Sequence, residues 1–112
     1  MAHANTFSAH HEEHDGAVVF YCKGSLTAEH SWRLKDEVKK WVSKKRITLD
    51  FREVDRMDSS GLGAVVGLYI SARKQNCEFL LVNYGESIRD LLGMSHLLNV
   101  FEAYGRSGTR SP

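Results

Sequence analysis

Residues Met57 to Gly63 read Met-Asp-Ser-Ser-Gly-Leu-Gly, and this stretch lies between a predicted strand and a predicted helix. Asp58 and Ser59 are typical of helix starts, because their side-chain oxygens accept hydrogen bonds from the free N–H groups of the first turn. Gly61 and Gly63 are unexpected there, since each glycine within a helix costs about 0.5–1 kcal/mol relative to alanine. The pattern indicates a first turn that another group approaches closely, or a helix that packs tightly on a sheet.

Spacing alone leaves two interpretations of this turn open. In the first, Asp58 and Ser59 only cap the helix, and the small residues ease its packing. In the second, the free N–H groups and the positive end of the helix dipole bind an anion such as phosphate. A phosphate-binding loop is a weaker hypothesis, because the stretch lacks the GxxxxGK[ST] pattern and no lysine follows within the turn.

The single proline is Pro112, so no proline marks the boundaries of the other elements. Glycines and changes in the periodicity of the apolar residues mark them instead. Asp15-Gly16 predicts a hairpin, and Gly24 is predicted to end the strand that follows. The predicted strands are 6–13, 17–22, 47–51, 77–82 and 97–101, the predicted helices are 27–44, 59–74 and 87–92, and a polar segment is predicted at 52–58. Strands that alternate with helices at this spacing need parallel crossover connections. The sequence therefore predicts one α/β domain.

Composition narrows the class of protein. The 112 residues are 42% hydrophobic, which is enough for the core of a single domain. A net charge of +1 argues against a nucleic-acid binder, and the apolar runs are too short to span a membrane. Cys22 and Cys77 are too few for a disulfide scaffold or a zinc cluster. We therefore expect a soluble cytoplasmic domain with buried thiols.

Four segments together resemble a known family. They are Gly24-Ser25-Leu26, the strand Ile47-Thr48-Leu49-Asp50-Phe51, the turn Met57 to Gly63 and the strand Leu80-Leu81-Val82-Asn83. The combination resembles the STAS domain and, more narrowly, the bacterial anti-sigma factor antagonists. The resemblance spans about residues 7–101 and implies a mixed β-sheet flanked by helices. We assign residues 6–102 to the domain and residues 103–112 to a flexible C-terminal tail.

The resemblance also implies a function and a site. In this family the first serine of the motif is phosphorylated by an anti-sigma factor that is also a protein kinase, which places the phosphoacceptor at Ser59, beside Ser60. The unphosphorylated protein binds the anti-sigma factor and frees sigma for transcription. Phosphorylation ends the binding, and a separate serine phosphatase restores it.

The partner-binding surface is predicted around the same turn. Its predicted members are Asp58, Ser60, Gly61, Leu62, Val66, Thr27 and Trp32. Trp32 is included because it lies off the core stripe of the first helix, and exposed aromatic residues favour interfaces. Thr27 occupies a position where family members commonly carry aspartate, so it is predicted to cap the helix while altering recognition at that corner. Residues 102–112 offer little for the further helix that many members have after the last strand.

Other sites have less support in the sequence. His10 and His14 would lie ~13 Å apart on one strand at 3.3 Å per residue, too far for one metal ion. Ser59 has no neighbouring histidine, and its surroundings do not reproduce the GxSxG elbow, so we expect neither an enzyme nor a cofactor. Asp50 lies in a predicted buried strand, where backbone amides near the strand end are its expected partners.

Two other functions remain open. One is a STAS scaffold or regulatory module of another assembly, such as a stress-signalling complex or a transporter ATPase, without sigma release. The other is a small-ligand or nucleotide-binding domain that uses the helix N-terminus.

Overall fold

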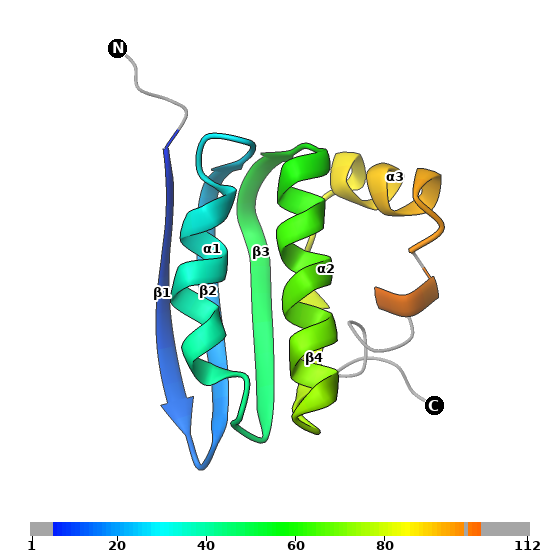
Figure 1. The fold of residues 1–112 in the computed structure, drawn as a ribbon. Coiled ribbons are helices and arrows are strands. Elements are labelled where there is room, and N and C mark those ends of the chain that lie inside the picture. Colours follow the sequence, from blue (N-terminus) through cyan, green and yellow to red (C-terminus); the bar gives the residue numbers. More distant parts are fainter. Residues whose placement is uncertain (1–5, 98, 102–112) are drawn as a thin grey trace.

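The structure is a computed structural model and describes residues 6–97 and 99–101. Its elements follow the chain as a hairpin and then strands alternating with helices (Figure 1). They are β1 (Phe7–His14), β2 (Ala17–Leu26), α1 (Ser31–Val38), the 3-10 helix η1 (Lys39–Trp41), β3 (Arg46–Met57), α2 (Ser59–Lys74), β4 (Glu78–Val82) and α3 (Glu86–Met94). The predicted α/β domain with a mixed sheet is confirmed, and α2 has the predicted bounds.

The sheet has the strand order β1-β2-β3-β4. β1 pairs antiparallel with β2, whereas β2, β3 and β4 run parallel. Helices α1 and α2 lie side by side on one face of the sheet, as Figure 1 shows. The first residue of α2 therefore lies at the end of the sheet where the parallel strands β2 and β3 finish, which is where ligand and partner sites of such folds usually form.

The Asp15-Gly16 hairpin is confirmed. Asp15 has φ 52° and Gly16 has φ 86°, so both residues of the turn are in the left-handed region. A type I′ turn requires this conformation, and Asp-Gly adopts it at low cost. His14 and Ala17 therefore stand opposite each other, which sets the register of β1 on β2.

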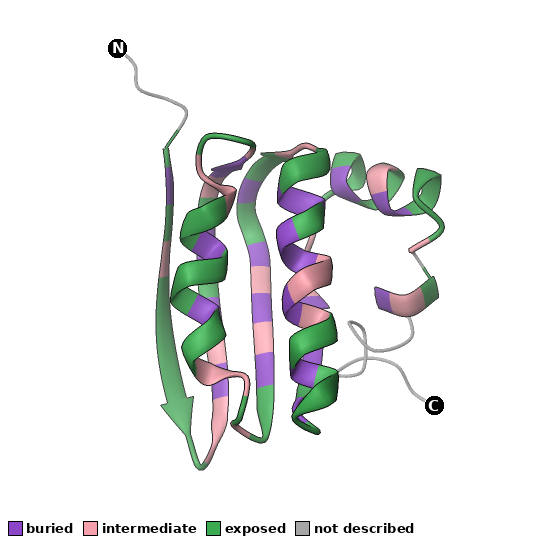
Figure 2. Cartoon of the chain, viewed as in Figure 1, coloured by how far each residue is buried: buried purple, intermediate pink, exposed green. Residues whose placement is uncertain are grey.

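The core lies between the sheet and the α1–α2 layer (Figure 2). Ile47, Leu49 and Phe51 alternate along β3 and are fully buried, as period-two alternation requires. Leu34 and Val38 cover them from α1. Each such side chain stabilises the fold by about 1.5–3 kcal/mol relative to an exposed position. This rigid layer fixes where α2 begins.

Two strands extend further than predicted. β2 continues through Gly24 to Leu26, and β3 continues through the polar segment to Met57. Gly24 has φ +105°, and a Cβ there would lie 2.1 Å from the carbonyl oxygen of Thr6. The prediction that Gly24 ends the strand is therefore wrong: it allows an irregularity inside the strand, where the register between β2 and β3 also shifts.

The first helix is shorter than predicted. It begins at Ser31, and His30 occupies the N-cap without a side-chain hydrogen bond. The backbone carbonyl of Thr27 accepts hydrogen bonds from the N–H groups of His30 and Ser31, at 2.9 and 2.8 Å. Thr27 thus belongs to the turn before α1, and the prediction that it caps the helix is wrong.

The predicted last strand is also wrong, because residues 99–101 are helical. The N–H of Phe101 donates to the carbonyl of Leu97 at 3.3 Å, and the Phe101 side chain is buried. A short apolar run fits a strand and a buried helical turn equally well by periodicity. The predicted tail and the expected lack of a further helix fall on residues that lie outside those described.

Both cysteines are buried and free, as predicted. Burial raises the pKa of the Cys22 thiol to about 12, and the nearby carboxylate of Asp50 adds to this shift. The thiol therefore stays protonated and unreactive at neutral pH. None of the helices within the described ranges is both long and apolar enough to cross a membrane.

Candidate functional site

Asp58 joins the start of α2 to the loop between β2 and α1. Its Oδ1 accepts a hydrogen bond from the N–H of Gly61, and its Oδ2 accepts one from the N–H of Ala28, each at 3.1 Å. The N–H of Asp58 donates to the carbonyl of Leu26 at 3.4 Å. One carboxylate thus satisfies orphan donors on two segments, so the predicted capping role is confirmed and the turn is held in one geometry.

Gly61 is required by a close approach of backbone. A Cβ at this position would lie 2.1 Å from the carbonyl oxygen of Leu26 and 2.8 Å from the Cγ of Met57. The prediction that another group approaches the first turn closely is confirmed, and that group is the end of β2. Gly63 and Gly67 differ, because a Cβ at either would meet nothing within 4 Å. Tight packing on the sheet is therefore the wrong explanation for these two glycines.

Ser59 and Ser60 are the first two residues of α2, and both are exposed. The free N–H groups of the first turn and the positive end of the helix dipole lie at this end of the helix. Beside it lies a hollow of about 290 Å³ that contains both charged and polar side chains. Its lining residues are Thr27, Ala28, Glu29, Arg56, Met57 and Asp58. The structure thus brings Thr27 next to the first turn of α2.

The other predicted partner-binding residues divide between two places. Leu62 is only 8% exposed and packs in the core, whereas Val66 is half-buried on α2. Trp32 is 58% exposed, but it lines a hollow with Phe7 and Ala9 of the edge strand β1. Trp32 therefore lines a different hollow from the one beside Ser59, although its Nε1 donates to the carbonyl of Glu29, which lines the latter.

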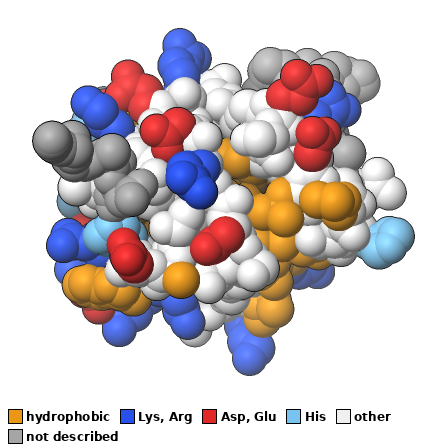
Figure 3. Space-filling model, turned by 90° about the horizontal axis from the view of Figure 1, so that it is seen from above, with side chains coloured by type: hydrophobic (Ala, Val, Ile, Leu, Met, Phe, Trp, Pro, Cys, Tyr) orange, Lys and Arg blue, Asp and Glu red, His pale blue; other side chains and the backbone are white. Residues whose placement is uncertain are grey.

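Two exposed apolar residues were missed by the sequence reasoning. Ile70 is 48% exposed and Met94, at the end of α3, is 74% exposed. Figure 3 looks onto the end of the molecule where α2 begins and shows hydrophobic side chains exposed among charged ones. Ile70 follows Val66 by four residues, a spacing that places both on one helix face. We call Gly63, Val66, Gly67 and Ile70 the outer face of α2.

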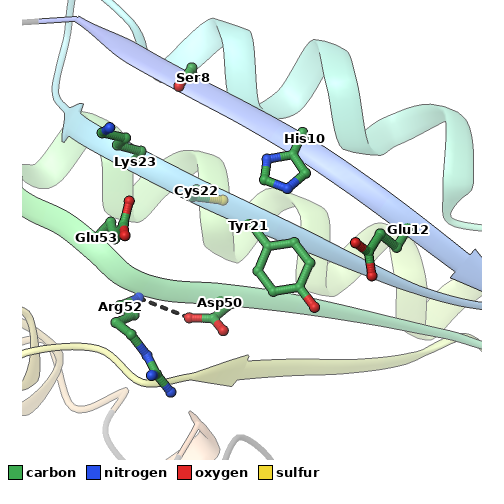
Figure 4. A pocket seen from close by; sticks show the side chains of 9 residues that line it. All are labelled: Ser8, His10, Glu12, Tyr21, Cys22, Lys23, Asp50, Arg52 and Glu53. Carbon is green, nitrogen blue, oxygen red and sulfur yellow. Dashed lines mark hydrogen bonds between the residues drawn. The ribbon is translucent and has the colours of Figure 1, made fainter.

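A larger hollow, of about 460 Å³, lies on the other face of the sheet (Figure 4). Its lining includes His10, stacked on Tyr21 with ring centres 5.1 Å apart, and Asp50. The carboxylate of Asp50 accepts from the backbone N–H of Arg52 at 2.9 Å and from Nδ2 of Asn83 at 3.2 Å. A backbone amide is thus one partner of Asp50, as predicted. The lining of this hollow does not include Ser59 or any other residue of the first turn of α2.

Metal ligands do not gather in the described part of the chain, where no three histidine, cysteine or acidic side chains lie close enough to share an ion. The histidines of β1 are instead engaged in ring contacts. His11 lies 4.7 Å from Trp41 and 5.4 Å from Phe20, centre to centre.

Comparison with known families gives a direct match. The sequence model of the STAS domain covers residues 8–109 of this chain. The chain belongs to the STAS domain family. The matched region contains every element of the fold except the first residue of β1, and it includes the turn from Asp58 to Gly61.

Curated relatives of this STAS domain include two antagonists of anti-sigma factors. The anti-sigma F factor antagonist of Paenibacillus polymyxa is 25% identical over 96 residues, which span 83% of this chain and 82% of that protein. The anti-sigma-B factor antagonist of Listeria monocytogenes is 29% identical over 87 residues, or 76% of each chain.

Solved structures share the fold. The anti-sigma factor antagonist SpoIIAA in its unphosphorylated form superposes with a TM-score of 0.73 at 20% identity, covering 94% of this chain and 100% of that one. An anti-sigma factor antagonist from Mycobacterium paratuberculosis gives a TM-score of 0.79 at 21% identity, covering 90% and 87% of the two chains. At these identities the likeness establishes the architecture of the STAS domain.

Proposed function

We propose that this STAS domain is an anti-sigma factor antagonist controlled by phosphorylation of Ser59. The unphosphorylated chain binds an anti-sigma factor that is also a serine protein kinase, and so regulates sigma-dependent transcription. The names of the two curated relatives support this role. The observation that carries the site assignment is an exposed Ser59 hydroxyl on a turn whose geometry is fixed by Asp58.

The chemistry of this turn suits a switch that leaves the fold intact. A phosphate on Ser59 adds about −1.5 to −2 charges at the start of a helix. The helix dipole favours an anion there by about 0.3–1 kcal/mol. Both carboxylate oxygens of Asp58 already accept hydrogen bonds from backbone N–H groups, so these bonds do not depend on the Ser59 hydroxyl. Phosphorylation therefore changes the charge of the surface without removing a bond that holds the turn.

The partner is the component that phosphorylation affects. A kinase that reaches Ser59 must cover the first turn of α2, and the outer face of α2 continues from that turn along the helix. Gly63 and Gly67 leave this face flat, and Ile70 offers it an apolar contact. A dianion at the border of such a contact introduces desolvation and like-charge costs of several kcal/mol if acidic groups of the partner face it. Release of the partner follows.

The corner near Thr27 is a further part of the surface that we propose the partner contacts. The hollow beside the turn presents Glu29 and Asp58 together with Arg56, so the partner meets both charge signs. Kinase and phosphatase are separate proteins in this proposal, and the chain is their substrate.

The proposal is tested by phosphorylation and binding. The chain is incubated with ATP and a serine-kinase anti-sigma factor encoded in the same genome, and intact mass is measured. We expect one added phosphate that Ser59→Ala abolishes and Ser60→Ala, the matched control, retains. We also expect Ser59→Asp to weaken binding by at least about tenfold, or ~1.4 kcal/mol. Binding without phosphate transfer would instead support a STAS module of another assembly.

A further inference from the structure

The outer edge of β1 is an unpaired strand edge. β1 is the outermost strand, and no described element lies beyond it (Figure 1). In a two-residue hairpin the residues that flank the turn exchange hydrogen bonds, and every second residue after them does the same. The N–H of Ser25 donates to the carbonyl of Thr6 at 2.9 Å, which agrees with this alternation. The backbone groups that point outward from the sheet therefore belong to Phe7, Ala9, His11 and Glu13.

The side chains of β1 are complementary to a reversed copy of the same strand. β1 reads FSAHHEEH. When two copies run antiparallel with His11 on the two-fold axis, His10 of each stands opposite Glu12 of the other. Ala9 then stands opposite Glu13, and both belong to the outward-bonding set. Opposite charges directly across an antiparallel pair stabilise the pairing.

We propose that β1 is a self-association edge through which two copies of this chain pair antiparallel about His11. The four-stranded sheets of the two copies then join into one continuous sheet. A two-fold axis at His11 is the isologous arrangement that most homodimers adopt. Strand addition at an open edge supplies main-chain hydrogen bonds, and the alternating side chains set the register.

Neighbouring registers have a less favourable pairing of charges. Moving the pairing by two residues in one direction places Glu12 opposite Glu12, and in the other direction His10 opposite His10. Like charges directly opposite each other are destabilising. The register centred on Glu12 also pairs His11 with Glu13 twice, but it places His10 opposite His14 twice as well. The register centred on His11 gives two His–Glu pairs against a single like pair, His11 with His11, and so has the better balance of charge.

The groups that surround His10 and His11 also affect the stability of the paired strands. His10 lies on the sheet face that α1 and α2 leave uncovered, packed on Tyr21 (Figure 4). The charged groups around it on that face are Glu12, Lys23, Asp50, Arg52 and Glu53.

His11 lies on the helix side against Trp41 and Phe20, where Lys44 pairs with Glu13 at 3.4 Å. The two His11 side chains stand opposite each other on the two-fold axis and add no favourable pair, so we expect a weak and reversible dimer.

Trp32 gives a second reason to expect a contact at this edge. Its ring is 58% exposed and is held by Nε1, which donates to the carbonyl of Glu29 at 3.1 Å. It lines a hollow of about 310 Å³ that includes Phe7 and Ala9 of β1. The charged members of that lining are Arg33, Asp36 and Glu37. Exposed tryptophan is enriched at interfaces, and here it borders the open edge. The dimer leaves Ser59 free, because α2 lies over the other half of the sheet (Figure 1).

The test is a charge swap measured by sedimentation equilibrium at pH 6.5 and low salt. We expect wild type to dimerise reversibly as concentration rises. His10→Glu and Glu12→His should each weaken the dimer about tenfold. The double variant His10→Glu/Glu12→His has the wild-type composition and restores both pairs, so it should dimerise as wild type does. A double variant no tighter than the single variants overturns the proposed register.

A second measurement needs no variant. Amide hydrogen exchange should slow with concentration at Ala9, His11 and Glu13, whose N–H groups point outward. The N–H groups of Ser8 and His10 point toward β2 and should not change. A chain that stays monomeric at every concentration overturns the proposal, and it would leave the edge to a strand from a different protein.

Discussion

The first turn of α2 and the outer face of the same helix both contain glycine, but the surroundings differ. Gly61 lies against the carbonyl oxygen of Leu26 and has no room for a side chain. Gly63 and Gly67 face open space. The first glycine is therefore required by the fold, whereas nothing among the described residues requires the other two. In the function proposed above, a partner approaches the helix at Gly63 and Gly67.

The largest expected effect comes from Gly61→Ala. The added Cβ would press on backbone, which cannot rotate away, so we expect the free energy of unfolding to fall by about 3 kcal/mol, at the upper end of overpacking costs. Chemical denaturation followed by circular dichroism measures the change. Gly63→Ala is the matched control and should not destabilise. Equal losses at both positions would remove the contrast between the two regions.

The next effect is on binding. Gly63→Arg places a bulky cation on the outer face of α2, where the chain itself offers free space. We expect unchanged folding and an affinity for the anti-sigma factor that falls at least about tenfold, or ~1.4 kcal/mol, in titration calorimetry. Lys35→Ala, on the exposed side of α1, serves as the control. Undiminished affinity of the Gly63 variant would show that the partner does not contact this face.

Asp58→Ala should have a moderate effect on stability. It removes the cap of α2 and the acceptor of the Ala28 N–H, so we expect a loss of about 1–2 kcal/mol in the free energy of unfolding. Asp58→Asn keeps a side-chain oxygen for one of the two donors and should lose less. A variant with alanine as stable as wild type would mean that Asp58 does not hold the turn.

The smallest effect should be a gain. Gly67→Ala adds a methyl group in open space within a helix, so we expect about 0.5–1 kcal/mol of added stability. Thermal unfolding measures it. Destabilisation here would indicate that the outer face of α2 is constrained by its own fold after all.

The sequence predicts α2 and its cap well because the information is local. Asp58 precedes the helix by one residue, and its bond to Gly61 spans three positions. The second bond of the same carboxylate, to Ala28, joins residues thirty positions apart. No local pattern shows that contact, nor the reason for Gly61, which depends on the position of Leu26.

The wrong predictions also arise from contacts that no local sequence pattern shows. The predicted end of β2 at Gly24 ignores a strand that continues because β3 lies beside it. The prediction for Thr27 assumes a helix four residues longer at its start than the tertiary structure allows. Trp32 is exposed, as its position on the helix predicts. The residues beside which it lies, however, belong to the edge strand β1. Ile70 could have been found from its spacing to Val66.

The central claim is that phosphate on Ser59 changes binding and leaves the fold unchanged. The most direct measurement compares phosphorylated and unphosphorylated chain in two experiments, titration against the anti-sigma factor kinase and thermal unfolding. The account predicts a large loss of affinity for the phosphorylated chain together with a melting temperature equal to or slightly above that of the unphosphorylated one. Equal affinities, or a phosphorylated chain that unfolds at a clearly lower temperature, would contradict it.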